Sequence, residues 1–72
     1  MDMNLKIGFL LRQKREACGL SLSEAGSKIG RTKSCVYYWE TGRNSIDVSM
    51  LSKICAVYGV DFYDFIDELK TL

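Results

Sequence analysis

The feature that most constrains the fold is the segment Ser21–Arg43, which is typical of two short helices joined by a tight turn. Ser21 and Glu24 form a capping-box pattern, S-x-x-E, in which the two residues satisfy each other's backbone N–H groups at the start of a helix. Gly30 follows where this helix must stop, because glycine enters the left-handed region without a Cβ penalty. The first half of the segment therefore predicts a helix from Ser21 to Gly30.

The second half of the segment has its own end signals. Thr32 can serve as an N-cap, and Gly42 can end the helix that follows. A glycine inside a helix is about 1 kcal/mol less favourable than alanine, so Gly26 indicates that another helix crosses there too closely for a side chain. One face of each helix is apolar, with Ala25, Gly26, Ile29, Val36 and Trp39. These patterns predict a helix-turn-helix over about residues 21–42.

The outward face of the second helix is the candidate functional surface. Its side chains can all donate hydrogen bonds and none is acidic, and they are Lys33, Ser34, Tyr37, Tyr38 and Thr41. Helical spacing places them in one stripe, away from Val36 and Trp39. Lys33 stands at the positive end of the helix dipole, which slightly disfavours folding but suits an anion such as phosphate. An exposed residue that slightly destabilises its own helix, as Lys33 does, indicates a functional role.

The remaining chain favours a single all-α domain over residues 1–72, with five helices. Hydrophobic residues make up 47 % and charged residues 26 %, and proline is absent, which argues against disorder. We expect a first helix from an N-cap at Asn4 to Cys18, a fourth from Asp47 to Tyr58, and a fifth over about 61–70. A core of this size supplies about 3–5 kcal/mol, so dimerisation is expected to help.

Charge is distributed unevenly along the chain. The net charge is +1, but residues 1–44 carry +4 and residues 45–72 carry −3. A basic half that holds the helix-turn-helix and an acidic half behind it are typical of a DNA-binding protein. The alternative is a solvated mixture of surface charges.

Several classes of function find no support in the residues. Cys18, Cys35 and Cys55 show no C-x-x-C spacing and there is no histidine, so the usual zinc ligands are missing. The odd number of thiols suits a reducing cytoplasm, with packing as their expected role. Neither a secretory signal nor a membrane-spanning run is present. Without a Gly-rich phosphate loop or a paired nucleophile and base, we expect no enzyme, cofactor, metal, membrane partner or small-molecule ligand, and a cytoplasmic location.

The span from about residue 7 to 66 resembles the Cro/C1-type (XRE-like) helix-turn-helix family of bacterial and phage repressors. The matching positions are Ile7, Gly8, Arg15, Gly19, Leu20, Ser21, Glu24, Ile29, Gly30, Thr32, Val36, Glu40, Gly42, Gly59, Val60 and Asp61. The resemblance implies a five-helix, lambda-repressor-like DNA-binding domain. In that family the second helix of the motif lies in the major groove of double-stranded DNA and the first crosses the phosphate backbone.

Carried over by position, the resemblance implies base or nearby phosphate contacts for the outer stripe, and backbone contacts from Thr32 and Arg43. The candidate DNA-binding residues are Ser21, Leu22, Ser23, Thr32, Lys33, Ser34, Tyr37, Tyr38, Thr41, Arg43 and Asn44. Leu22 stands where the family usually has a glutamine that touches phosphate, so this side-chain contact is lost. Ile46 replaces a common proline. A simple solvated connection is the alternative for the loop at Arg43 and Asn44.

The resemblance also implies a structural ion pair between Arg15 and Glu40. A guanidinium offers a carboxylate two parallel hydrogen bonds, which can tie two helices together. The alternative is that both side chains are exposed and unpaired.

The fifth helix has more apolar residues than a terminal helix on a small core needs. Its candidate dimer residues are Phe62, Tyr63, Phe65, Ile66 and Leu69. A surplus apolar face suggests a partner subunit, and a helix that only caps the core is the alternative. The sequence thus predicts a sequence-specific DNA-binding transcriptional regulator that acts as a repressor and a homodimer. The second hypothesis is a protein-interaction module, antitoxin-like or anti-repressor, because Leu22, Tyr37 and Tyr38 would suit a protein interface.

Overall fold

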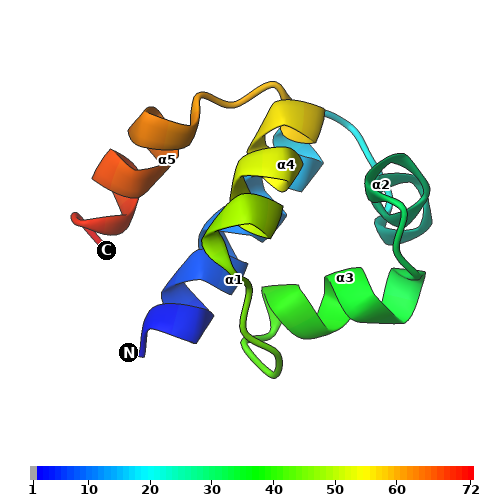
Figure 1. The fold of residues 1–72 in the computed structure, drawn as a ribbon, viewed down its shortest axis with the longest axis horizontal. Coiled ribbons are helices and arrows are strands. Elements are labelled where there is room, and N and C mark those ends of the chain that lie inside the picture. The colour runs from blue at the N-terminus through cyan, green and yellow to red at the C-terminus, as the bar shows by residue number, and fades with distance from the viewer. Residues whose placement is uncertain (1) are drawn as a thin grey trace.

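A computed structural model describes residues 2–72 of the chain as five α-helices, with no strand in that range (Figure 1). They are α1 (Met3–Ala17), α2 (Leu22–Ile29), α3 (Lys33–Glu40), α4 (Val48–Tyr58) and α5 (Phe62–Leu69). The predicted all-α class is confirmed. None of these helices combines the length and the apolar character that a membrane crossing needs.

Side-chain caps set where the helices begin. At α2, Ser21 Oγ accepts from the N–H of Glu24 at 3.0 Å, and Glu24 Oε1 accepts from the N–H of Ser21 at 2.9 Å, so the capping box is present. The N-cap of α1 is Asp2, whose carboxylate accepts from Leu5 N–H at 2.9 Å. The prediction of Asn4 as this N-cap is wrong. Both residue types cap well, but the helix gains two residues by starting at Asp2, whose negative charge also suits its positive end.

The core draws on all five helices. α3 packs against α1 and α2, and α5 packs against α1 and α4, so that α5 lies on one side of the molecule and the α2–α3 pair on the other (Figure 1). Buried hydrophobic residues are Leu10, Leu11, Ala25, Ile29, Val36, Trp39, Leu51, Ile54, Cys55, Tyr58, Phe65 and Leu69. Of the three thiols, Cys55 is in this core, whereas Cys18 is exposed because it is the C-cap of α1. The expected packing role therefore fails for Cys18.

Two glycines mark the closest approaches in the fold. A Cβ at Gly26 would lie 2.6 Å from the carbonyl oxygen of Arg31. The close neighbour is thus the turn of the motif itself, and not a crossing helix as expected. A Cβ at Gly8 would lie 2.5 Å from the carbonyl oxygens of both Trp39 and Glu40. The backbone of α1 therefore rests directly on the end of α3.

We expect Gly8→Ala to destabilise the protein by about 1–3 kcal/mol, because the new methyl group meets backbone atoms that cannot turn away. An alanine in an open helix position would instead stabilise by about 1 kcal/mol. Urea denaturation of the two proteins measures the difference, and a gain in stability would contradict this close approach.

Candidate nucleic-acid interface

The helix α3 has an inner face in the core and an outer face in solvent. Val36 and Trp39 belong to the core cluster. On the other side, Lys33, Ser34, Tyr37 and Thr41 are exposed, and Tyr38 is half-buried. The inner side chains fix α3 in place, and the outer ones remain available to a partner.

The turn before α3 is built on the backbone of α2. Gly30 N–H and Arg31 N–H both donate to the carbonyl oxygen of Gly26, each at 2.8 Å. Gly30 has a φ of 84°, which ends α2 in the left-handed region. Thr32 then caps α3 by accepting from Cys35 N–H at 3.1 Å. This short connection explains why the two helices keep a fixed mutual orientation.

The start of α2 lies next to α3 and contributes unequally to the surface. Ser21 and Ser23 are exposed, whereas Leu22 is half-buried and packs against the core. Leu22 also lines a hollow of about 160 Å³, together with Arg12, Arg15, Tyr37, Glu40 and Thr41. Leu22 is thus partly withdrawn from the surface on which the sequence placed it.

Arg12 of α1 was missed as a candidate for this surface. Its side chain lines the same hollow as Tyr37 and Thr41, so α1 adds a cation beside α3. The Arg12 side chain is exposed, and its Nε lies 3.3 Å from Oε2 of Glu16, one turn along α1. Helical periodicity places Arg12 on the outside of α1, but that signal does not tell which neighbouring helix an outer residue approaches.

The polar groups at the end of α3 are engaged with one another. The Arg43 guanidinium carbon lies 4.6 Å from the centre of the Tyr38 ring, a cation–π geometry. The rings of Tyr37 and Tyr38 are 5.9 Å apart and tilted by 56°. The Thr41 hydroxyl donates to the carbonyl oxygens of Tyr37 at 3.1 Å and Tyr38 at 3.3 Å. Asn44 is exposed in the loop that follows.

Three cations lie along the outer face of α3. Lys33 is exposed at the start of the helix, Arg43 lies over the Tyr38 ring at its end, and Arg12 lines the hollow beside Tyr37 and Thr41. The nearby carboxylates have local partners: Glu16 pairs with Arg12, Glu40 binds Arg15, and Glu24 caps α2. Two hydrogen bonds with Ser21 hold the pKa of the Glu24 carboxyl below its usual range, and the backbone N–H of Ser21 has the larger effect. The surface therefore offers cations and neutral donors to an anionic partner.

Arg15 and Glu40 form a bidentate ion pair behind this surface. Arg15 Nε lies 2.7 Å from Glu40 Oε2 and Arg15 Nη2 lies 3.0 Å from Oε1, while Nη1 donates to Leu20 O at 2.8 Å. The two side chains are 10 % and 5 % exposed. The hydrogen bond with Glu40 raises the pKa of the Arg15 guanidinium. Burial raises the pKa of the Tyr58 hydroxyl to about 12. The pair links α1, the loop before α2 and the last residue of α3.

The sequence of residues 6–64 matches a family model described as a helix-turn-helix domain. The chain belongs to this family. The match includes both helices of the motif and the residues of the Arg15–Glu40 pair. Comparison with curated proteins gave no match.

Several solved structures share the fold of all or most of the chain. The clp gene regulator ClgR from Corynebacterium glutamicum is similar with a TM-score of 0.92 at 21 % identity, over 99 % of this chain and 76 % of that one. The hypothetical transcription factor NHTF from Neisseria is similar with a TM-score of 0.82 at 25 % identity, over 99 % of this chain and 86 % of that one. The restriction-modification controller protein C.AhdI from Aeromonas hydrophila is similar with a TM-score of 0.80 at 24 % identity, over 86 % of this chain and 90 % of that one. The resemblance to Cro/C1-type domains is confirmed.

We expect Arg15→Ala to lower the free energy of unfolding by about 3–5 kcal/mol, because it leaves the Glu40 carboxylate buried and alone. Arg12→Ala is the matched control, since it removes an arginine of the same helix from an ion pair whose side chains are 64 % and 55 % exposed. Such an i, i+4 pair is worth about 0.3–0.5 kcal/mol. Equal losses in the two variants, measured by urea denaturation, would mean that burial does not strengthen the Arg15 pair.

Proposed function

We propose that the protein is a sequence-specific DNA-binding transcriptional regulator that acts as a repressor and reads the major groove with α3. The observation that carries the proposal is the acid-free outer face of α3, held from behind by Val36 and Trp39, with Arg12 and Arg43 beside it. An α-helix fits the major groove, where base edges can be read. Similar solved structures are described as a clp gene regulator and a hypothetical transcription factor, which supports the same role here.

The proposed contacts follow the direction of each side chain. Lys33 and Ser34 stand at the start of α3, so Lys33 can donate to guanine O6 or N7, and Ser34 can reach a base or phosphate. Ser21 and Ser23 at the start of α2, with Thr32, Arg43 and Asn44, would hold the phosphate backbone. These residues lie at the exposed ends of α2 and α3 and in the loop after α3. The starts of α2 and α3 are N-terminal helix ends, where backbone N–H groups also favour phosphate.

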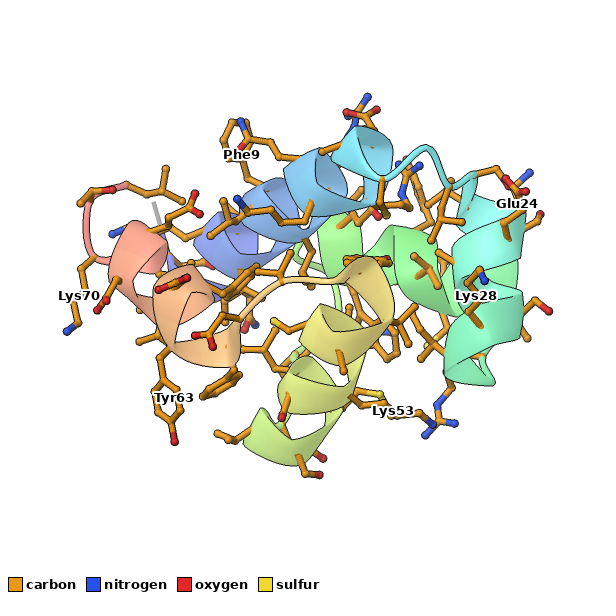
Figure 2. All side chains as sticks on the ribbon, turned by 90° about the horizontal axis from the view of Figure 1, so that it is seen from above. Phe9, Glu24, Lys28, Lys53, Tyr63 and Lys70 are labelled. Carbon is orange, nitrogen blue, oxygen red and sulfur yellow. The ribbon has the colours of Figure 1, made fainter. Side chains whose placement is uncertain are left out.

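A homodimer is the second part of the proposal, with α5 at its interface. Phe65 is fully buried in the core and so is not available as a contact surface, and Leu69 is only 7 % exposed, because α5 uses both to pack on α1 and α4. The remaining candidates are more accessible: Phe62 and Ile66 are half-buried, and Tyr63 is 76 % exposed and points away from the fold (Figure 2). Symmetry would place two reading helices about 34 Å apart, on successive faces of the major groove.

An apolar groove beside α5 gives the proposed dimer a second contact area. The groove has a volume of about 450 Å³ and is lined by Met3, Lys6, Ile7, Ile46, Val48, Leu51, Ile66, Leu69 and Lys70. Its charged lining residues are Lys6 and Lys70, and Lys70 Nζ already lies 3.6 Å from Asp67 Oδ1 of α5. The apolar side chains that α5 exposes in a second copy would thus match the groove in polarity.

A protein-interaction module remains the second candidate function. Its support is Tyr37, which is 50 % exposed on α3, because exposed aromatic residues are favoured in protein interfaces. The position of Leu22 weakens this candidate, since its side chain is partly packed against the core. Absence of any DNA binding at low salt would favour it over the first.

We expect selection from a random DNA pool to recover a symmetric site that the protein binds more weakly as salt rises, because bound phosphates release counterions. Lys33→Ala should then weaken binding about tenfold, and Lys53→Ala, which removes an exposed lysine from α4, should leave it unchanged. A gel-shift titration measures both. Equal affinity of the Lys33→Ala and unaltered proteins would remove Lys33 from the interface.

For the dimer, we expect Val48→Lys to raise the dissociation constant at least tenfold, because the exposed Val48 lines the groove and an ammonium group would be buried there beside Lys6 and Lys70. Ala56→Lys, at an exposed position near the other end of α4, is the matched control and should have no effect. Analytical ultracentrifugation reports both values. A dimer that is insensitive to Val48→Lys would place the interface elsewhere.

A further inference from the structure

We propose that the protein recognises thymine in its DNA site by the C5-methyl group, which the rings of Tyr37 and Tyr38 contact. The inference rests on the proposed function, in which α3 enters the major groove. It names the chemical group that is read there and the two side chains that read it.

The first step is the chemistry that α3 lacks. Strong discrimination by hydrogen bonds in the major groove comes from bidentate side chains: arginine or lysine on guanine, and asparagine or glutamine on adenine. The sequence of α3 is K-S-C-V-Y-Y-W-E, so Lys33 is its one residue of this set, and no arginine, asparagine or glutamine follows along the helix. Its acid, Glu40, is buried in the pair with Arg15 and is not available to cytosine. Lys33 and Ser34 alone offer short or single-point polar contacts at the start of the helix.

The second step is the loss of a polar group at the other end of α3. The Thr41 hydroxyl donates to the carbonyl oxygens of Tyr37 and Tyr38. Its proton is therefore committed to the protein backbone, and the side chain retains a methyl group as its apolar end. The exposed stripe thus becomes less polar toward Thr41 than the sequence suggests.

The third step is the way in which the tyrosine rings are held. The guanidinium carbon of Arg43 lies 4.6 Å from the centre of the Tyr38 ring. The Tyr37 ring lies against the Tyr38 ring, with 5.9 Å between the two ring centres. A ring that is fixed before binding loses little conformational entropy on contact. Arg43 is thus a positioning residue for Tyr38. Among the four bases, only thymine presents an apolar group in the major groove, and an apolar ring edge is its natural partner.

Replacement of thymine by uracil in the DNA tests the proposal, because uracil pairs identically and lacks only the C5-methyl group. The site is first obtained by selection from a random DNA pool with the full chain, and each thymine is then replaced in turn. One buried methyl group corresponds to about a fourfold change in affinity, or about 0.8 kcal/mol. We expect this loss at one or two positions in each half-site, measured by gel-shift titration.

Four tyrosine variants and one variant of Arg43 assign the methyl contact to the rings. Tyr37→Phe and Tyr38→Phe keep the ring without the hydroxyl, so they should keep the fourfold preference for thymine over uracil. Tyr37→Ser and Tyr38→Ser should each abolish it at one position. Arg43→Gln should lower affinity for both bases through the lost phosphate contact, and should in addition reduce the preference for thymine at the Tyr38 position but not at the Tyr37 position. Circular dichroism checks the fold of each variant.

The outcomes separate this inference from the proposed function. A selected site that binds equally well with every thymine replaced would overturn the methyl contact and leave DNA binding in place. Preference that persists in both serine variants, or disappears in the phenylalanine variants, would also overturn it, because the ring would not be the reader. Failure to select any DNA would remove the proposed function and this inference together.

Discussion

The arrangement of α3 depends on the buried pair of Arg15 and Glu40. Glu40 is the last residue of α3, and two N–H groups of Arg15 bind its carboxylate from α1. A third N–H group of Arg15 holds Leu20 O, in the loop that leads into α2. Close to this pair, Gly8 allows the backbone of α1 to rest on the carbonyl groups of α3. Three segments of the chain thus meet at one guanidinium, and the angle of α3 against α1 follows from it.

The local parts of the fold could be predicted from the sequence because they depend on short-range chemistry. Ser21 with Glu24 and Thr32 with Cys35 are three residues apart, so their hydrogen bonds follow from spacing alone. Burial of Val36 and Trp39 follows from helical periodicity in the same way.

Long-range packing could not be predicted in the same detail. Nothing near Gly26 in the sequence tells whether a helix or a turn lies against it. In the sequence of α5 alone, Phe65 and Leu69 are apolar residues beyond those that a terminal helix needs. They are buried in the core only because α5 folds back against α1 and α4. At the candidate site, the sequence gives the residues of the outer stripe but not their rotamers. The Arg43–Tyr38 contact and the inward hydroxyl of Thr41 depend on those rotamers.

The support of α3 from behind has a consequence for how such proteins diverge. Its contacts with the rest of the fold use Val36, Trp39, Glu40 and the backbone near Gly8, and none of these lies on the outer stripe. Exchange of Lys33, Ser34 or Tyr37 therefore alters what the helix presents without disturbing what holds it. This separation suits a scaffold that keeps its shape at 21 % identity. New partners can be acquired by drift at a few solvent-facing positions, while selection for foldability acts on the others.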